Sequence, residues 1–277
     1  MPVPTDHHLW IVAYDDMQAL DLTGPHEVFA TANRVADGYG LGELRYRLRI
    51  MARDTHLVAT ESGLRIGVDQ LPPSGEAPDT LVVPGGDGAP KFSTNDPLVE
   101  WVGDTGRASK RLACVCTGAF IAASAGLLDQ RKVTTHWARA SKLARRFPAT
   151  EVDPDAIYIC DTSSALPQVW SSAGVTAGID LALALVEADL GAKVAQEVAR
   201  WLVVFLRRAG GQSRSNGRRT RTDRQTARVW HGRDHAPRLP SSPRGCSRRL
   251  PPALCPFELT DSIPRNEIHH ADRNPSV

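Results

Sequence analysis

The sequence predicts an α/β protein with a doubly wound, mostly parallel sheet. Short apolar runs that end in acidic residues or glycines are typical of buried parallel strands, and segments with helical spacing of apolar residues follow them. This alternation indicates a sheet covered by helices on both faces. The 277 residues, 42% of them hydrophobic, suffice for one such domain with a substantial core.

The N-terminal part of the chain supplies the first elements in this order. HLWIVAYDD (8–16) is an apolar run that ends in acids, and DTLVVPGGDGA (79–89) is one that ends in a glycine turn. Ser62-Gly63 suits the turn of a hairpin. We expect strands at 8–16, 46–53 and 79–89, a hairpin at 56–69, and helices at 24–36 and 97–108.

The pattern continues with a third core strand, RLACVC. We expect strands at 111–116, 156–161 and 168–174, and helices at 117–128, 136–148 and 175–208, the last of them broken near Gly191. The helix that contains LALALVEADL has a face apolar enough to pair with a second subunit. These elements predict one domain over residues 7–213.

After residue 213 the pattern stops. Residues 214–277 hold thirteen arginines, no lysine, six acids and eight prolines, which gives +7 and leaves −5 for residues 1–213. We expect this segment to be a disordered basic tail, because it is too poor in large aliphatic residues to offset its ordering entropy. Such a composition also results when GC-rich coding DNA is read out of frame. The alternative is a basic arm that binds nucleic acid through its charge.

The remaining composition excludes several classes of protein. The N-terminus has no basic segment followed by a long apolar run, and no stretch approaches the length of a membrane span. Five cysteines at irregular spacing do not form a disulfide framework. We therefore expect a cytoplasmic protein with no membrane contact.

The candidate site lies where the core strands end, since ligands of parallel α/β sheets bind there. Cys116 follows the third strand in the layout of a nucleophile elbow, and Gly118 lets neighbouring backbone come close. A helix start should lower the pKa of the Cys116 thiol. Gly85 and Gly86 follow the central strand, and the N–H groups of Gly86 and Thr117 could form an oxyanion hole.

An alternative is that Cys116 is a buried small hydrophobic residue. We interpret Cys114 and Cys160 as core residues of that kind. No pair of cysteines has the spacing of a zinc site, so we predict neither a metal nor another cofactor.

Several motifs resemble a known family. VVPGG, VCTGAF, AGLLDQRKVTTHW and SSAGVTAGIDLALALVE are similar to the ThiJ/PfpI family, the glutamine-amidotransferase-like class of α/β proteins with a flavodoxin-like sandwich. More narrowly, they resemble the N-terminal sensor domain of AraC-type transcription regulators. FLRRAGGQS is the sequence with which that domain typically ends. Two helix-turn-helix units follow in those regulators, whereas here the resemblance stops at Ser213.

The resemblance implies the site residues. The elbow cysteine of the family falls on Cys116, its acid on Asp21 and its histidine on His136. An isonitrile hydratase of similar motif implies roles for Asp21, Cys116 and Thr117. A protonated Asp21 could donate a hydrogen bond to the sulfur or act as a general acid. His136 is either a base for a cysteine hydrolase or a structural histidine before Trp137.

Two functions follow from the resemblance. The first is a small-molecule sensor of an AraC-type regulator that lacks its intact helix-turn-helix part, with an amine or quaternary ammonium ligand. The second is a cysteine-dependent hydratase or hydrolase with Cys116 as nucleophile. The resemblance also implies a homodimer, and DNA binding only where an intact helix-turn-helix is present.

Overall fold

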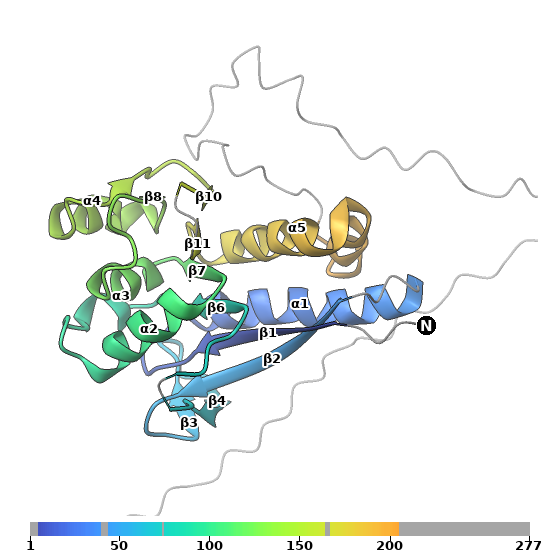
Figure 1. Ribbon diagram of the computed structural model, residues 1–277, viewed down its shortest axis with the longest axis horizontal. Coiled ribbons are helices and arrows are strands. Elements are labelled where there is room, and N and C mark those ends of the chain that lie inside the picture. Colours follow the sequence, from blue (N-terminus) through green and yellow to red (C-terminus); the bar gives the residue numbers. More distant parts are fainter. Residues whose placement is uncertain (1–4, 40–43, 74, 164–166, 205–277) are drawn as a thin grey trace, which may run out of the picture. The chain divides into compact units, whose positions relative to one another are not determined.

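The computed structural model describes residues 5–39, 44–73, 75–163 and 167–204. These residues form a seven-stranded sheet in the order β10-β11-β7-β6-β1-β2-β5 with helices on both faces (Figure 1). The sheet strands are β1 Thr5–Val12, β2 Leu44–Ala52, β5 Asp69–Gln70, β6 Thr80–Val83, β7 Arg111–Val115, β10 Tyr158–Asp161 and β11 Gln168–Ser172. All neighbouring pairs are parallel except β10 with β11, which confirms the predicted mostly parallel sheet.

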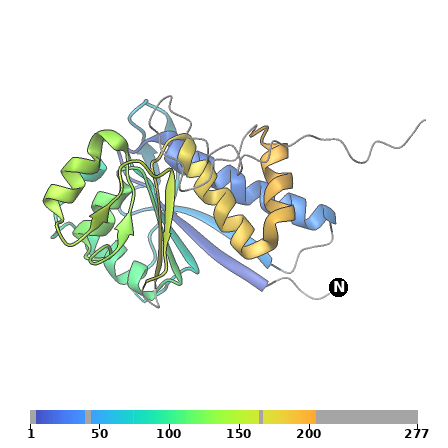
Figure 2. The same ribbon diagram turned by 90° about the horizontal axis from the view of Figure 1, so that it is seen from above.

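The helices cover the sheet as a sandwich. They are α1 Ala19–Tyr39, η1 Ala89–Lys91, α2 Pro97–Ala108, α3 Gly118–Ser124, α4 Trp137–Arg146 and α5 Thr176–Trp201. α1 and α5 lie side by side on one face of the sheet, and α2 and α3 lie on the opposite face (Figures 1 and 2). The described helices include none that is long and apolar enough to cross a bilayer.

Most predicted elements are found, with differences at their ends. The hairpin is present as β3 Leu57–Ala59 paired with β4 Arg65–Gly67, and Gly63 in its turn has φ +84°. The first helix begins at Ala19 rather than at residue 24, so Asp21 lies in its first turn. The short strands β8 Lys132–Val133 and β9 Glu151–Val152 pair with each other and were not predicted.

The long last helix is interrupted as expected. Gly191 has φ +82° and ψ 165°, which is not helical, so α5 consists of two helices joined at a kink. The expectation that LALALVEADL presents an apolar face to a second subunit is wrong for three of its four leucines. Leu181, Leu183 and Leu185 are buried in the core, where α5 packs against α1.

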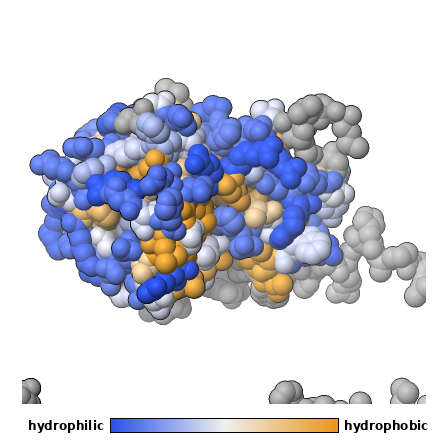
Figure 3. Space-filling view, turned by 90° about the horizontal axis from the view of Figure 1, so that it is seen from below, coloured by the Kyte–Doolittle hydropathy of each residue, from blue (hydrophilic) through white to orange (hydrophobic). Residues whose placement is uncertain are grey.

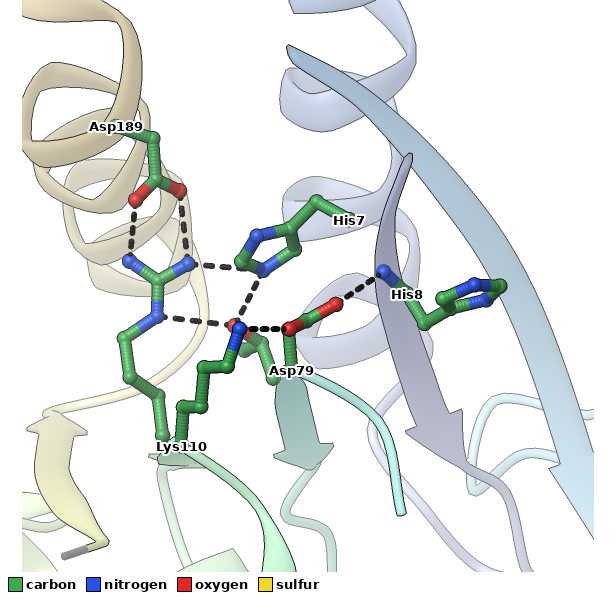
Figure 4. Close-up of polar contacts among 7 residues, drawn as sticks. His7, His8, Asp79, Lys110 and Asp189 are labelled. Atoms are coloured by element: carbon green, nitrogen blue, oxygen red, sulfur yellow. Dashed lines mark hydrogen bonds and ion pairs between the residues drawn. The ribbon is translucent and has the colours of Figure 1, made fainter. Parts of the chain in front are cut away.

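A buried polar network fixes α5 to the amino end of the sheet (Figure 4). Arg111, at the start of β7, donates to both carboxylate oxygens of Asp189 on α5, each at 2.7 Å. Its Nε donates to Oγ1 of Thr80, and its Nη2 lies 3.0 Å from Nε2 of His7. Because a guanidinium only donates, Nε2 of His7 is the acceptor. Burial and the Arg111 charge lower the pKa of His7, which keeps the imidazole neutral.

Candidate functional site

Cys116 occupies the turn between β7 and α3. Its φ is +57°, a conformation that non-glycine residues adopt only where the surroundings enforce it. The N–H of Cys116 donates to the carbonyl of Ser172 at 2.9 Å, and the hydroxyl of Thr135 donates to the carbonyl of Cys116 at 2.6 Å. The backbone of Cys116 is thus fixed in a strained turn between two neighbouring segments.

Two glycines allow backbone to pack closely around this turn. A Cβ atom on Gly118 would lie 2.1 Å from the carbonyl oxygen of Val83, so the strand β6 passes directly against the start of α3. A Cβ atom on Gly174 would lie 2.1 Å from Cβ of Cys116 and 2.6 Å from its sulfur. Gly174 has φ +82°, which favours glycine for a second reason. The sequence reasoning assigned no site role to Gly174.

Asp21 is fully buried beside Cys116. Its Oδ1 accepts the N–H of Val175 at 2.6 Å, and its Oδ2 accepts the N–H of Gly85 at 3.1 Å. A hydrogen bond also joins the carboxylate to the thiol of Cys116. Asp21 therefore ties together the first turn of α1, the loop after β6 and the start of α5.

Burial raises the pKa of Asp21 to about 6. The hydrogen bonds from Val175, Gly85 and Cys116 lower it again, because they stabilise the ionised form. The shift has the direction that the sequence predicted. At neutral pH the carboxylate remains ionised and accepts hydrogen bonds, so it does not donate to the sulfur in that state.

The pKa of the Cys116 thiol is raised, first by burial and then by the charge of Asp21. The expectation of a lowered pKa is wrong, for two reasons. α3 spans only seven residues, and its start is covered by the surrounding chain. The backbone N–H groups of Gly85 and Val175 donate to the carboxylate of Asp21, so they stabilise negative charge there and not on the sulfur. The pair thus holds a single negative charge, on the carboxylate.

Thr117 and Gly86 are bonded to each other. The Thr117 hydroxyl donates to the carbonyl of Gly86 at 2.7 Å and accepts the N–H of Gly86 at 2.8 Å. Hydrogen bonds from Thr117 to the Cys116 sulfur lower the thiol pKa, in opposition to burial. Of the two expected oxyanion donors, Thr117 faces the sulfur, while the N–H of Gly86 is already occupied by a hydroxyl.

The family of the chain follows from its match to a family description. Residues 7–188, about two thirds of the chain, match the DJ-1/PfpI family. The chain belongs to the DJ-1/PfpI family. The matched segment includes Asp21, Gly85, Cys116 and the start of α5, so the family assignment covers every part of the site.

Three relatives are similar to this chain in sequence. An uncharacterised protein of Streptomyces lividans is 38% identical over 52% of this chain and 96% of its own length. Isonitrile hydratase of Pseudomonas putida is 27% identical over 67% of this chain and 73% of its own. The HTH-type transcriptional regulator GlxA of Rhizobium meliloti is 29% identical over 58% of this chain and 48% of its own. The chain spans about half the length of that regulator.

Solved structures share the fold. A ThiJ/PfpI family protein from Pseudomonas syringae has a TM-score of 0.60 and 27% identity, over 72% of this chain and 76% of that one. An AraC family transcriptional regulator structure from Pseudomonas putida has a TM-score of 0.58 and 22% identity, over 71% and 99% of the two chains. The second likeness shows the DJ-1/PfpI fold only.

The other residues singled out in the sequence lie in different places. His136 is the residue before α4, and its ring lies 5.6 Å from that of Trp137, whose side chain is exposed. Its neighbour Thr135 provides the bond to the Cys116 carbonyl. Cys114 is buried in β7 as expected, but Cys160 is exposed, so its interpretation as a core residue is wrong. Among the described residues no group of His, Cys, Asp or Glu is arranged to hold a metal ion.

Tyr14 is a site residue that sequence reasoning missed. Its hydroxyl donates to the carbonyl of Pro84 at 2.6 Å, and its side chain is buried. Burial and the nearby Asp21 and Cys116 raise its pKa well above the ordinary value, so the hydroxyl stays protonated. The signal available in the sequence was its position at the carboxyl end of the first strand, within an apolar run.

Proposed function

We propose that this chain is the ligand-sensing domain of an AraC-type transcription regulator whose helix-turn-helix part is not intact in the sequence. The observation that carries the proposal is the burial of Cys116 against the buried carboxylate of Asp21. Burial and the Asp21 charge raise the pKa of the thiol, which makes it a poor nucleophile at neutral pH. The regulator relatives support the same conclusion.

The proposal extends to ligand and assembly. The resemblance to regulator domains favours an amine or quaternary ammonium ligand. A homodimer is part of the proposal. Figure 3 shows a band of hydrophobic residues bordered by hydrophilic ones on one face of the molecule. We propose this band, rather than the buried leucines of α5, as the surface that contacts a second copy.

A second candidate function is a cysteine-dependent hydratase or hydrolase. The observation that favours it is the complete Asp21, Cys116 and Thr117 set, together with the similarity to isonitrile hydratase over 73% of that enzyme. In that case the ionised Asp21 takes the thiol proton as the sulfur adds to the unsaturated carbon of the substrate, and it then gives this proton to the substrate. Water afterwards displaces the sulfur from that carbon, which releases the hydrated product and restores the thiol.

One experiment separates the two functions. The full chain is mixed with amines, quaternary ammonium compounds and isonitriles, and both its thermal unfolding and the amount of each compound are followed. A compound that raises the unfolding temperature and is not consumed supports the sensor. A compound that is consumed by the wild type and by Cys114→Ser, but not by Cys116→Ser, supports the hydratase and contradicts the sensor.

The proposal that the DNA-binding part is not intact has its own test. The gene is resequenced from the codon for Trp201 to beyond Val277, and all frames are translated. A frame that continues FLRRAGGQS into two helix-turn-helix units supports the regulator origin. If no frame does, or if the full chain binds DNA sequence-specifically, the proposal of a lost DNA-binding part is overturned.

A further inference from the structure

A cavity of about 190 Å³ opens at the carboxyl edge of the sheet, separate from Cys116. It lies among the residues that follow β1 and β2 and those that precede α2. The residues that line it include the large apolar and aromatic residues Tyr14, Val58, Phe92 and Leu98. The rings of Tyr14 and Phe92 meet edge to face, with centroids 5.3 Å apart. We name this space the Tyr14 cavity.

The rim of the Tyr14 cavity is negatively charged. Asp15, Asp54 and Asp96 line it, against a single cation, Arg53. The guanidinium Nε of Arg53 lies 2.6 Å from Oδ2 of Asp54, so these two charges largely cancel. Asp15 and Asp96 remain as the net charge of the rim, which disfavours anionic ligands.

Both remaining carboxylates are held in place by backbone. Oδ1 of Asp15 accepts the N–H of Ala59 at 2.8 Å, and Oδ1 of Asp96 accepts the N–H of Leu98 at 2.8 Å. Within the described part of the chain, neither Oδ2 atom has a protein hydrogen-bond partner. A cavity lined by two fixed carboxylates and two aromatic rings is suited to an ammonium group attached to a small apolar body.

We infer that the Tyr14 cavity is a binding site for a small organic cation and that Tyr14 links it to Cys116. This inference deepens the proposed sensor function and rests on it. The ammonium group pairs with Asp15 and Asp96 at the rim, and the apolar body lies against the rings of Tyr14 and Phe92. The volume of about 190 Å³ is below the roughly 300–1,000 Å³ of most ligand pockets, so the cavity admits only a small ligand.

The link to Cys116 runs through the loop after β6. The ring of Tyr14 lines the cavity, while its hydroxyl donates to the carbonyl of Pro84 at 2.6 Å. The next residue, Gly85, donates to Asp21, the partner of the Cys116 thiol. A ligand that displaces the Tyr14 ring therefore shifts the loop that stabilises the ionised Asp21, and so alters the reactivity of Cys116.

Three compounds of one size and different charge test the binding site on the full chain. Benzylamine is cationic at neutral pH, benzyl alcohol is neutral and benzoate is anionic. By titration calorimetry we expect benzylamine to bind more tightly than the other two. Asp15→Asn should weaken it about fivefold, the range of a partly exposed ion pair. The control Glu151→Gln, an exposed acid outside the cavity, should leave binding unchanged. Equal binding of benzoate, or no effect of Asp15→Asn, would overturn the inference.

The link is tested by the alkylation rate of Cys116, measured by peptide mass spectrometry. Saturating benzylamine should change that rate in the wild type but not in Tyr14→Phe, which keeps the ring and lacks the bond to Pro84. Unchanged alkylation in the wild type would overturn the link. If benzylamine does not bind while another small molecule raises the unfolding temperature without being consumed, the inference fails and the sensor function stands. If no tested compound binds, both fail.

Discussion

The backbone N–H of Val175 donates to the carboxylate of Asp21 at 2.6 Å, which joins the start of α5 to the first turn of α1. Val175 has φ +53°, and the preceding Gly174 lies against the sulfur of Cys116. One buried carboxylate therefore sets the position of α5 and the protonation of the thiol together. Any ligand that changes the charge or position of Asp21 should therefore change both the position of α5 and the protonation of the Cys116 thiol.

Removing the charge of Asp21 should make Cys116 more reactive. In Asp21→Asn the thiol no longer faces a negative charge, so its pKa falls toward the ordinary value. We expect faster alkylation of Cys116 by iodoacetamide at pH 8 than in the wild type, read by peptide mass spectrometry. If Asp21 instead activates the thiol as a base, the variant will react more slowly, which contradicts this account.

The same variant should change how stability depends on pH. Between pH 3.8 and about 6 the folded protein keeps a proton on Asp21 that the unfolded chain has lost. The contribution of Asp21 to the free energy of unfolding therefore falls as pH rises through that window. The free energy of unfolding of Asp21→Asn, compared with that of the wild type, should therefore rise by about 2–3 kcal/mol from pH 4 to pH 7, measured by urea unfolding. A difference that does not change with pH contradicts the raised pKa.

Asp161 provides a control of opposite sign. Burial raises its pKa, but hydrogen bonds from Ser163 and Lys132 outweigh burial and hold the pKa at about 2. Its stabilising contribution is present above the unfolded pKa and is lost as pH falls toward 2. Asp161→Asn should therefore lose stability relative to wild type as pH rises from 2 to 5.

Gly174→Ala should be more destabilising than its conformation alone explains. Both Gly174 and Gly63 have φ near +80°, but a Cβ on Gly63 meets nothing within 4 Å, whereas on Gly174 it would overlap Cys116. Gly63→Ala should cost about 1 kcal/mol from strain alone. We expect at least about twice that cost for Gly174→Ala, by thermal or urea unfolding. Equal costs would show that the contact with Cys116 is not as tight as described.

The buried pair of Arg111 and Asp189 should be important for the attachment of α5. Their side chains are 9% and 13% exposed, so Asp189→Asn leaves a largely buried guanidinium without its counter-charge. We expect a loss of about 3 kcal/mol in the free energy of unfolding. Asp6→Asn, which breaks the exposed pair with Arg47, should cost less than about 1 kcal/mol. Similar losses in the two variants would contradict the network in Figure 4.

The sequence was sufficient to predict the sheet, because runs such as LWIV and TLVV are apolar without interruption and are bounded by glycines and acids. The break in α5 could also be predicted from the sequence, since Gly191 interrupts an otherwise continuous helical pattern. The two-residue strands β8 and β9 were not predicted, because pairs of residues carry no period. The predicted tail at 214–277 lies outside the described residues.

The chemistry of the site was harder to predict than its location. Asp21, Cys116 and Thr117 do meet, but the direction of the thiol pKa depends on burial and on where the N–H groups of Gly85 and Val175 point. Neither can be read from local spacing. Tyr14 was missed for the same reason, since its bond to Pro84 joins segments seventy residues apart.

The most direct test of this account is the pH dependence of Cys116 alkylation in the wild-type chain. Because burial and Asp21 hold the thiol protonated, we predict slow modification at pH 7 and a rate that is still rising above pH 9. A rapid reaction at pH 7 that levels off below pH 8.5 would show a stabilised thiolate. That result would contradict the sensor proposal and support Cys116 as a working nucleophile.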